Sequence, residues 1–217
     1  MDKYISSFSN KIFSIFKRDL LLFVTNLITS VVVARTLGPG MLGVWMILSL
    51  FPAYAESFGR FKADVASVYF IGQKTFRHED ILFNLNLIAL ASSTIVVFIF
   101  LWQFEAVYGW LFSNEVNDYR LELLILTIQI PLNFLYLNYS YFHLANENIY
   151  VYNRMLVIYA WINSSVAIIL LLLTSLGLWS VIFASLLSLM LALLYGWKAI
   201  DRKNWISGNF SRKLSFE

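Results

Sequence analysis

The chain has 217 residues, of which 59% are hydrophobic and only 13% are charged. Together with a mean hydropathy of +0.70, this composition excludes an ordinary water-soluble domain, in which about a quarter of the residues carry charge. The formal charge of +3 does not indicate nucleic-acid binding, because basic cytoplasmic loops give membrane proteins the same excess.

Six apolar stretches follow one another along the chain, and each is about long enough to cross a hydrocarbon core as a helix. We predict spans over residues 20–34, 42–58, 81–102, 121–145, 155–174 and 178–199. The first span is short unless it begins near Ile12. Because the connections are short, residues 1–217 are expected to form a single all-α polytopic membrane domain with six transmembrane helices.

Basic residues are distributed unequally between the two sides of these spans. If the N-terminus is cytoplasmic, Arg35 and Arg120 are the basic residues left outside, and the other 14 of the 16 lie inside. Cytoplasmic loops of membrane proteins carry the excess of lysine and arginine. The pattern therefore predicts a multi-pass protein of the cytoplasmic membrane with both termini in the cytoplasm.

The signatures of soluble enzymes do not occur. The sequence has no GxxxxGK[ST], GxGxxG, HExxH or GxSxG pattern and no cysteine, and its two histidines, His78 and His143, are about 65 residues apart. A surface or packing role for these histidines is favoured over metal binding. We therefore expect no enzymatic activity, no metal and no cofactor.

Polar side chains within the spans are the unusual feature. A charge at the centre of the bilayer costs about 2.5–3.5 kcal/mol on insertion scales, and polar groups there face a bundle interior or an aqueous cavity. A single asparagine is well explained by an interhelical hydrogen bond, but the set favours a polar cavity between helices. The set comprises Asp19, Asn26, Glu56, Asn84, Asn86, Gln129, Asn133, Asn138 and Asn163.

The second span carries charges at a helical spacing. Glu56, Arg60 and Asp64 are four residues apart, so they share one face and can form a ladder of opposite charges, while Pro52 breaks a backbone hydrogen bond one turn earlier. One interpretation is an interfacial ion-pair ladder on a helix that continues toward Gly72. The other is a substrate gate or headgroup contact at the cytoplasmic mouth.

The fourth span has a similar interruption. Pro131 lies between two polar residues, Gln129 and Asn133, and a proline in a membrane helix permits bending, although many such prolines only shape packing. Pro52 and Pro131 are therefore the helix-hinge candidates.

The first hairpin carries a resemblance. Residues 33–43 read VARTLGPGMLG, which resembles the ARxLGPxxxG signature between the first two helices of Wzx-type polysaccharide flippases, members of the multidrug/oligosaccharidyl-lipid/polysaccharide exporter superfamily. Gly38-Pro39-Gly40 suits a tight external turn. Gly59, Pro131 and the LGLW run at 176–179 are similar to the family's usual layout.

The resemblance implies a MATE-like fold, of which this chain looks like one lobe, the N-terminal half of a transporter with twelve to fourteen helices. It implies flipping of an undecaprenyl-diphosphate-linked oligosaccharide by alternating access in surface polysaccharide synthesis, such as O-antigen and lipopolysaccharide assembly in bacteria. The implied partners are the bilayer, this lipid-linked substrate, and a second lobe or second copy. The coupling ion, H⁺ or Na⁺, stays open.

Two alternatives remain beside the flippase. A drug or cation antiporter of the same superfamily would depend on acidic residues, and a non-transporting scaffold of an envelope-synthesis complex would depend on none. An anionic diphosphate would instead favour basic groups. The candidate substrate-binding or gating residues are accordingly Arg35, Arg60, Lys62, Glu56, Asp19 and Asn26.

Overall fold

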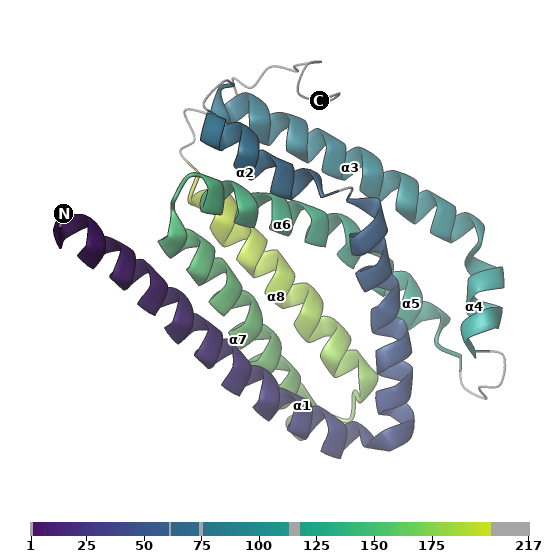
Figure 1. Ribbon diagram of the computed structural model, residues 1–217. Coiled ribbons are helices and arrows are strands. Elements are labelled where there is room, and N and C mark those ends of the chain that lie inside the picture. Colours follow the sequence, from purple (N-terminus) through teal and green to yellow (C-terminus); the bar gives the residue numbers. More distant parts are fainter. Residues whose placement is uncertain (1, 61, 74–75, 113–117, 201–217) are drawn as a thin grey trace.

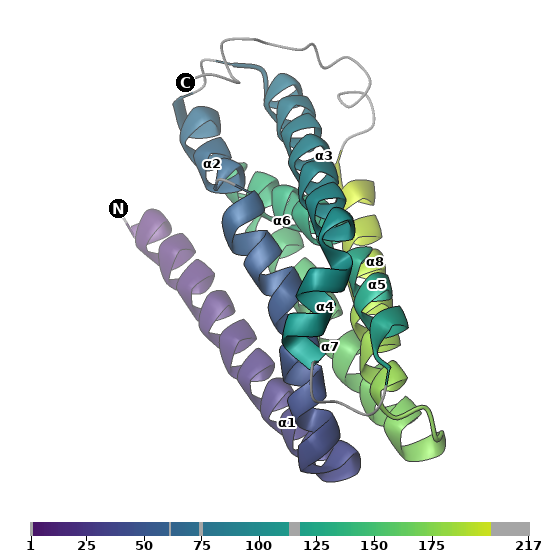
Figure 2. The ribbon, with the colours of Figure 1, turned by 90° about the vertical axis from the view of Figure 1, so that its right-hand side faces the viewer.

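The computed structural model describes residues 2–60, 62–73, 76–112 and 118–200, and not the side chains of residues 2–12 and 64. Within these ranges the chain forms eight helices and no strand, as an all-α membrane protein requires, since only helices satisfy every backbone group within one span in lipid. The N-terminus, α2, the α6–α7 turn and the end of α8 gather at one end of the bundle. The turn in α1, α4 and the α7–α8 connection lie at the other end (Figures 1 and 2).

The first helix, α1 (Asp2–Gly59), contains the predicted turn. Gly38 has non-helical backbone angles, φ 72° and ψ 173°, in a region that glycine adopts without the penalty a Cβ would bring. Pro39 follows directly, and proline suits the first position of a helix because its missing N–H has no partner there. One residue thus reverses the chain, and α1 consists of a first arm before Gly38 and a second arm after it (Figure 2).

Among the described residues, five helices are long and apolar enough to cross a membrane. This is one fewer than predicted, because the first two predicted spans form the single helix α1, in which residues 13–59 count once. The other four are α3 (His78–Trp102), the α5–α6 pair, α7 (Ile149–Leu173) and α8 (Leu178–Lys198). The chain therefore has the helices of a multi-pass membrane protein.

The predicted continuation of the second span toward Gly72 is wrong. α1 ends at Gly59, and a separate helix, α2 (Ala63–Gln73), follows. Lys62, between them, has a positive φ of 54°, which no α-helix contains, and its carbonyl accepts hydrogen bonds from the amides of Val65 and Ala66. Lys62 therefore ends one helical segment and begins the next.

A short helix that was not predicted follows α3. This helix, α4 (Phe104–Phe112), is separated from α3 by Gln103 alone, whose amide still bonds the carbonyl of Ile99 at 3.1 Å. The polar residues Gln103 and Glu105 mark the boundary at which the predicted span ends, but they gave no sign that a further helix follows. Phe112 is buried and packs with Tyr119 and Leu123 in the core at this end of the bundle.

The fourth predicted span is broken into α5 (Arg120–Thr127) and α6 (Gln129–Ala145). The break lies at Ile128, whose amide bonds the carbonyl three residues back, Ile125, at 3.1 Å. Pro131 explains the position, because a proline lacks the N–H that would reach Thr127 and its ring crowds that carbonyl. The interruption is therefore real, and it lies one turn before the proline.

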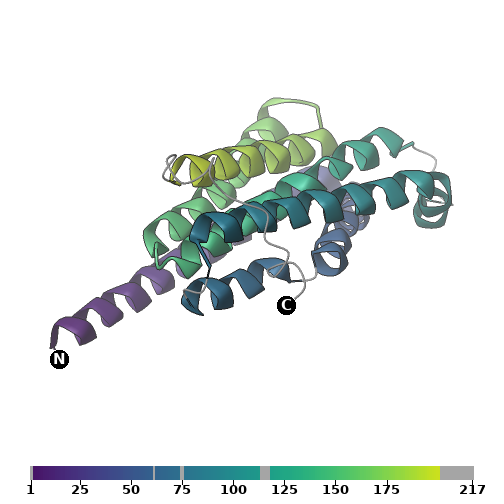
Figure 3. The same cartoon turned by 90° about the horizontal axis from the view of Figure 1, so that it is seen from above.

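The remaining helices pack around α6, which contacts α2, α3 and α8 and is overlain by α3 when seen from above (Figure 3). Close approach is possible where a helix carries glycine: a Cβ at Gly59 would lie 2.9 Å from Val96 Cγ2 and 3.0 Å from Phe134 Cζ. Phe134 is one of the largest fully buried side chains. The end of α1 is thus held directly against α3 and α6.

Candidate functional site

The clearest polar site inside the bundle is centred on Glu56, in the second arm of α1. Its Oε1 accepts a hydrogen bond from Arg60 Nη1 at 3.0 Å, and its Oε2 accepts one from Asn133 Nδ2 at 2.7 Å. Arg60 is 7% exposed, whereas the Glu56 side chain is 36% exposed. The site therefore joins the second arm of α1 to α6.

Both prolines lie close to this site along their helices. Pro52 precedes Glu56 by four residues, and Pro131 precedes Asn133 by two, so each partner of the 2.7 Å hydrogen bond follows a position where a helical backbone bond is lost. The bond consequently ties together two proline-containing helices, of which the second arm of α1 stays helical through Pro52. The 3.0 Å contact between Arg60 and Glu56 confirms the predicted pair, and Asn133 is a third member that was not predicted as a partner. The side chain of Asp64 lies outside the described residues.

A second polar cluster ties the first arm of α1 to α7. Arg18 donates to Asp19 Oδ1 at 2.8 Å and to Asn153 Oδ1 at 2.6 Å, and Asn153 Nδ2 donates to Ser14 Oγ at 3.2 Å. The Arg18 guanidinium also lies 5.3 Å from the centre of the Tyr152 ring. Asp19 was predicted as a candidate, but Arg18 and Asn153 were not. Asn153 lies two residues before the predicted span 155–174, and this position was the signal available.

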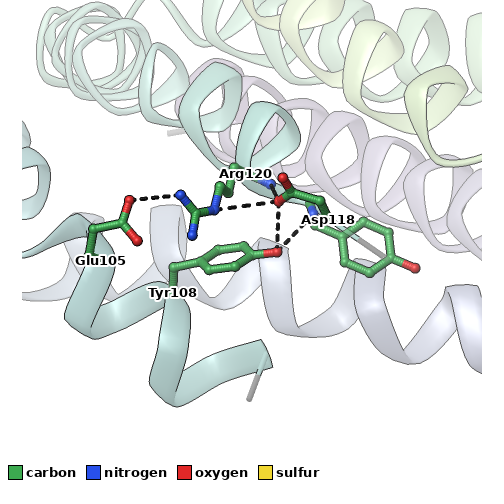
Figure 4. Close-up of polar contacts among 5 residues, drawn as sticks. Glu105, Tyr108, Asp118 and Arg120 are labelled. Carbon is green, nitrogen blue, oxygen red and sulfur yellow. Dashed lines mark hydrogen bonds and ion pairs between the residues drawn. The ribbon is translucent and has the colours of Figure 1, made fainter. Parts of the chain in front are cut away.

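A third cluster holds the opposite end of the bundle (Figure 4). Arg120 donates to Glu105 Oε1 at 2.9 Å and lies 3.6 Å from Asp118 Oδ1, and Asp118 accepts a hydrogen bond from Tyr108 Oη at 2.9 Å. The Tyr108 oxygen in turn accepts a hydrogen bond from the backbone amide of Tyr119 at 3.0 Å. Desolvation and the Asp118 carboxylate raise the pKa of Tyr108, so its hydroxyl stays protonated as a donor. This cluster fixes α4 against the start of α5.

The basic candidates are not brought together. Arg35 is exposed beside the turn of α1, whereas Arg60 and Lys62 lie at the other end of the second arm. Lys62 is exposed and Arg60 is directed to Glu56. The three residues therefore do not form one anion site. Arg35 lies near one expected membrane surface, and Arg60 and Lys62 lie near the other.

The asparagines divide between packing and surface positions. Asn138 Nδ2 donates to the Leu85 carbonyl of α3 at 2.9 Å, and Asn84 Nδ2 donates within its own helix to Asp80. Asn86 Nδ2 reaches Tyr139 Oη at 3.3 Å, while Asn26 is exposed. In the part of the chain that the structure describes, these residues do not line one shared cavity. The interhelical hydrogen bond explains Asn138 best.

Metal binding finds no support among the described residues, where no group of three or more histidine, aspartate or glutamate side chains could hold an ion. His143 is 3% exposed, and its Nε2 lies 3.0 Å from the Gly196 carbonyl. This contact joins α6 to α8. His143 is therefore a packing residue, in agreement with the prediction.

One large groove opens between α3 and α6. Its volume is about 1050 Å³, and it is lined mainly by apolar side chains, with Glu79 near one end and the Asn86–Tyr139 pair along its wall. A smaller hollow of about 210 Å³ lies between the first arm of α1 and α7. Comparison of the chain with protein-family models, curated proteins and solved structures finds no match.

Proposed function

We propose that this chain is one lobe of a Wzx-type flippase, which moves an undecaprenyl-diphosphate-linked oligosaccharide across the bacterial cytoplasmic membrane with a second lobe or second copy. The lobe corresponds to six membrane crossings, two of them made by the arms of α1, with both termini in the cytoplasm. The VARTLGPGMLG run supports this proposal, because its Gly38-Pro39 pair makes the sharp reversal between the two arms.

The observation that carries the proposal is an exposed polar stripe on the first arm, formed by Asp19, Asn26 and Ser30. Steps of seven and four residues place them on one helix face, and all three are exposed rather than packed into the bundle. Polar groups at membrane depth face a water-filled cavity or a partner. A single lobe leaves this stripe uncovered, whereas a second lobe facing it would enclose an aqueous path.

The Glu56 site contains a hydrogen bond that can change when the two lobes move relative to each other. Its hydrogen bond to Asn133 links α1 and α6 close to Pro52 and Pro131, so a small bend in either helix would lengthen or break the bond. We assign Glu56 and Arg60 a gating role near the cytoplasmic mouth. The exposed Arg35 is the residue assigned to the anionic headgroup on the outer side.

Solvent accessibility along the first arm tests whether the polar stripe lines an aqueous path. The chain contains no cysteine, so single cysteines at Asn26 and Ser30 can be compared with controls at Val24 and Val31, which are exposed on the apolar face of the same arm. In intact cells that also express the partner lobe, a small hydrophilic thiol reagent should modify the two stripe positions and not the two controls. Equal lack of reaction at all four positions would contradict an aqueous path along this arm.

Transport is tested at Arg35. In a strain that depends on the complete transporter, Arg35→Ala should severely reduce surface polysaccharide at a normal protein level, and Arg35→Lys should reduce it partly, because lysine keeps the charge but loses the bidentate geometry. Full surface polysaccharide from Arg35→Ala would remove this residue from the substrate path.

An antiporter of the same superfamily remains the second candidate, and Glu56 favours it, because a partly exposed carboxylate within a span can exchange a proton or cation. The substitution Glu56→Gln distinguishes the antiporter from the flippase. It should abolish ion-coupled drug efflux in the antiporter, whereas loss of polysaccharide without any effect on drug resistance supports the flippase.

A further inference from the structure

The small hollow between the first arm of α1 and α7, called here the α1–α7 hollow, lies where these two helices run side by side (Figure 1). Its lining combines four hydroxyl side chains with three larger apolar or aromatic ones: Thr25, Thr29, Ser164, Ser165, Ile28, Ile168 and Trp161. The threonines lie on either side of the middle of the predicted span 20–34, and the serines lie at the middle of the predicted span 155–174. The hollow is therefore expected at the depth of the bilayer centre.

The two threonines present hydrogen-bond acceptors to the hollow. Thr25 Oγ1 donates to the Leu21 carbonyl, and Thr29 Oγ1 donates to the Thr25 carbonyl, both at 2.8 Å. A hydroxyl group has one hydrogen and two acceptor lone pairs, so each oxygen has spent its hydrogen on its own helix and keeps its lone pairs. Both threonines can therefore accept a hydrogen bond from a donor in the hollow.

Ser164 and Trp161, both on α7, add polar groups that are not hydrogen-bonded within the part of the chain that the structure describes. Ser164 is 5% exposed, and its Oγ has no partner there. Trp161 carries an indole N–H, which can only donate, and it lies inside a predicted span rather than at a membrane edge, where indole rings usually reach water. A polar group buried without a hydrogen bond is unfavourable, so the hollow favours an occupant that bonds to these groups.

Water is the occupant that fits this set of groups. It can donate to the threonine oxygens and accept from the indole, whereas a metal cation cannot accept a hydrogen bond and a hydrocarbon chain does neither. None of the described residues that line the hollow is charged, so an ion in it would have no counter-charge. One bound water needs only about 10–15 Å³ and about two to four polar partners, and the hollow, at about 210 Å³, meets both conditions.

We propose that the α1–α7 hollow is a hydration site, in which ordered water at the depth of the bilayer centre bridges the first arm to α7. The water bonds Thr25 and Thr29 on one side and Ser164 on the other. Nearer the N-terminal ends of the same two helices, Arg18 and Asn153 make a direct contact at 2.6 Å. The first arm is thus joined to α7 by side chains at one end and by exchangeable water at its middle. This inference does not rest on the proposed function.

Radiolytic labelling of the purified full chain in lipid nanodiscs tests for the water. A short X-ray pulse produces hydroxyl radicals from water, including water bound within a membrane protein, and these radicals oxidise neighbouring side chains. Ile28 and Leu27 form a matched pair, because they are 50% and 52% exposed and Ile28, unlike Leu27, lines the hollow. We expect Ile28 to be oxidised several-fold faster than Leu27. Equal rates would show that the hollow is dry or filled by lipid, and would overturn the inference.

Two serines distinguish a hydrated hydroxyl from a dry one. Ser164 and Ser180 are 5% and 0% exposed, and neither Oγ is bonded to a described residue, but Ser180 lines neither the groove nor the hollow described above. Ser164→Ala should lower the midpoint of thermal unfolding and slow the oxidation of Ile28, because the water loses a partner. Ser180→Ala should raise the midpoint or leave it unchanged, because it removes an unsatisfied hydroxyl. If Ser164→Ala behaves as Ser180→Ala does, the inference is wrong.

The acceptor side and the identity of the occupant are tested by a second pair of variants. Thr36, on the same arm, makes the same bond to the carbonyl four residues back at 2.8 Å but does not line the hollow. Thr29→Val should slow the oxidation of Ile28 and Thr36→Val should not, whereas equal rates in the two variants would contradict water at Thr29. Replacement of Na⁺ and K⁺ by choline should leave the unfolding midpoint unchanged. A shift that Ser164→Ala abolishes would identify a metal cation and overturn the assignment to water.

Discussion

Alanine substitution of Glu56 and Arg60, singly and together, measures whether the buried charge pair acts as a unit. A hydrogen bond to a charged group contributes about 1.5–3 kcal/mol, a buried pair that loses one member costs about 3–5 kcal/mol, and a surface pair is worth about 0–1 kcal/mol. Because Arg60 is 7% exposed and Glu56 is 36% exposed, the coupling should lie between the buried and surface cases, at about 2 kcal/mol.

The losses caused by the two single substitutions should then add up to more than the loss caused by the double substitution. We expect a loss of about 3 kcal/mol for Glu56→Ala, which also removes the bond from Asn133, about 2 kcal/mol for Arg60→Ala, and about 3 kcal/mol rather than 5 for the double variant. Asn133→Leu alone should cost about 1.5 kcal/mol, the lower end of the range for a hydrogen bond to a charged group. The free energy of unfolding is measured by reversible unfolding of the protein in mixed detergent and lipid micelles.

A matched cycle provides the control. Arg120 and Glu105 form an ion pair at 2.9 Å, but their side chains are 47% and 70% exposed, so their coupling should not exceed about 0.5–1 kcal/mol. If the Glu56–Arg60 cycle is as close to additive as this control, the two residues act as independent surface charges, and the gating role assigned to them loses its physical basis.

Two further predictions concern topology and packing. With both termini in the cytoplasm, a cysteine introduced at Ser175 should react with a membrane-impermeant thiol reagent in intact cells and one at Gln73 should not; the reverse result would invert the orientation. Gly59→Ala should lower the free energy of unfolding by about 1–3 kcal/mol, because the new Cβ would lie 2.9 Å from Val96 Cγ2. Gly40→Ala, where nothing lies within 4 Å, should not lower it, and equal losses in thermal unfolding would rule out the close contact as the cause.

The apolar pattern predicted the helices well because the bilayer dictates their length and composition. It failed where the boundary depends on the backbone rather than on hydropathy. Lys62 ends a helical segment through its positive φ, although its sequence neighbours suit a continuous helix. The predicted third span ends correctly at Trp102, but the short helix α4 that follows was not predicted. The first two predicted spans correspond to the two arms of α1, which meet at the non-helical Gly38.

The polar contacts were predictable only over short separations. The Glu56–Arg60 pair follows from a spacing of four residues, and the structure confirms it at 3.0 Å. Asn133 is 77 residues from Glu56, and a pairing over that distance depends on how α1 and α6 pack, which hydropathy does not specify. The α3–α6 groove could not be predicted for the same reason. It lies where these two helices, whose hydropathy patterns are similar, are no longer in contact.

The contact between Arg18 and Asn153 has a consequence for the order of assembly in the membrane. The two residues are 135 positions apart, so at about 5–20 residues per second the ribosome needs on the order of ten seconds after Arg18 to supply its amide partner. Until then the adjacent Asp19 carboxylate, which also pairs with Arg18 at 2.8 Å in the folded chain, is the nearest counter-charge in the sequence. We therefore expect replacement of Asp19 to reduce the yield of inserted protein more than the stability of the finished one, in which Asn153 is a second partner of Arg18.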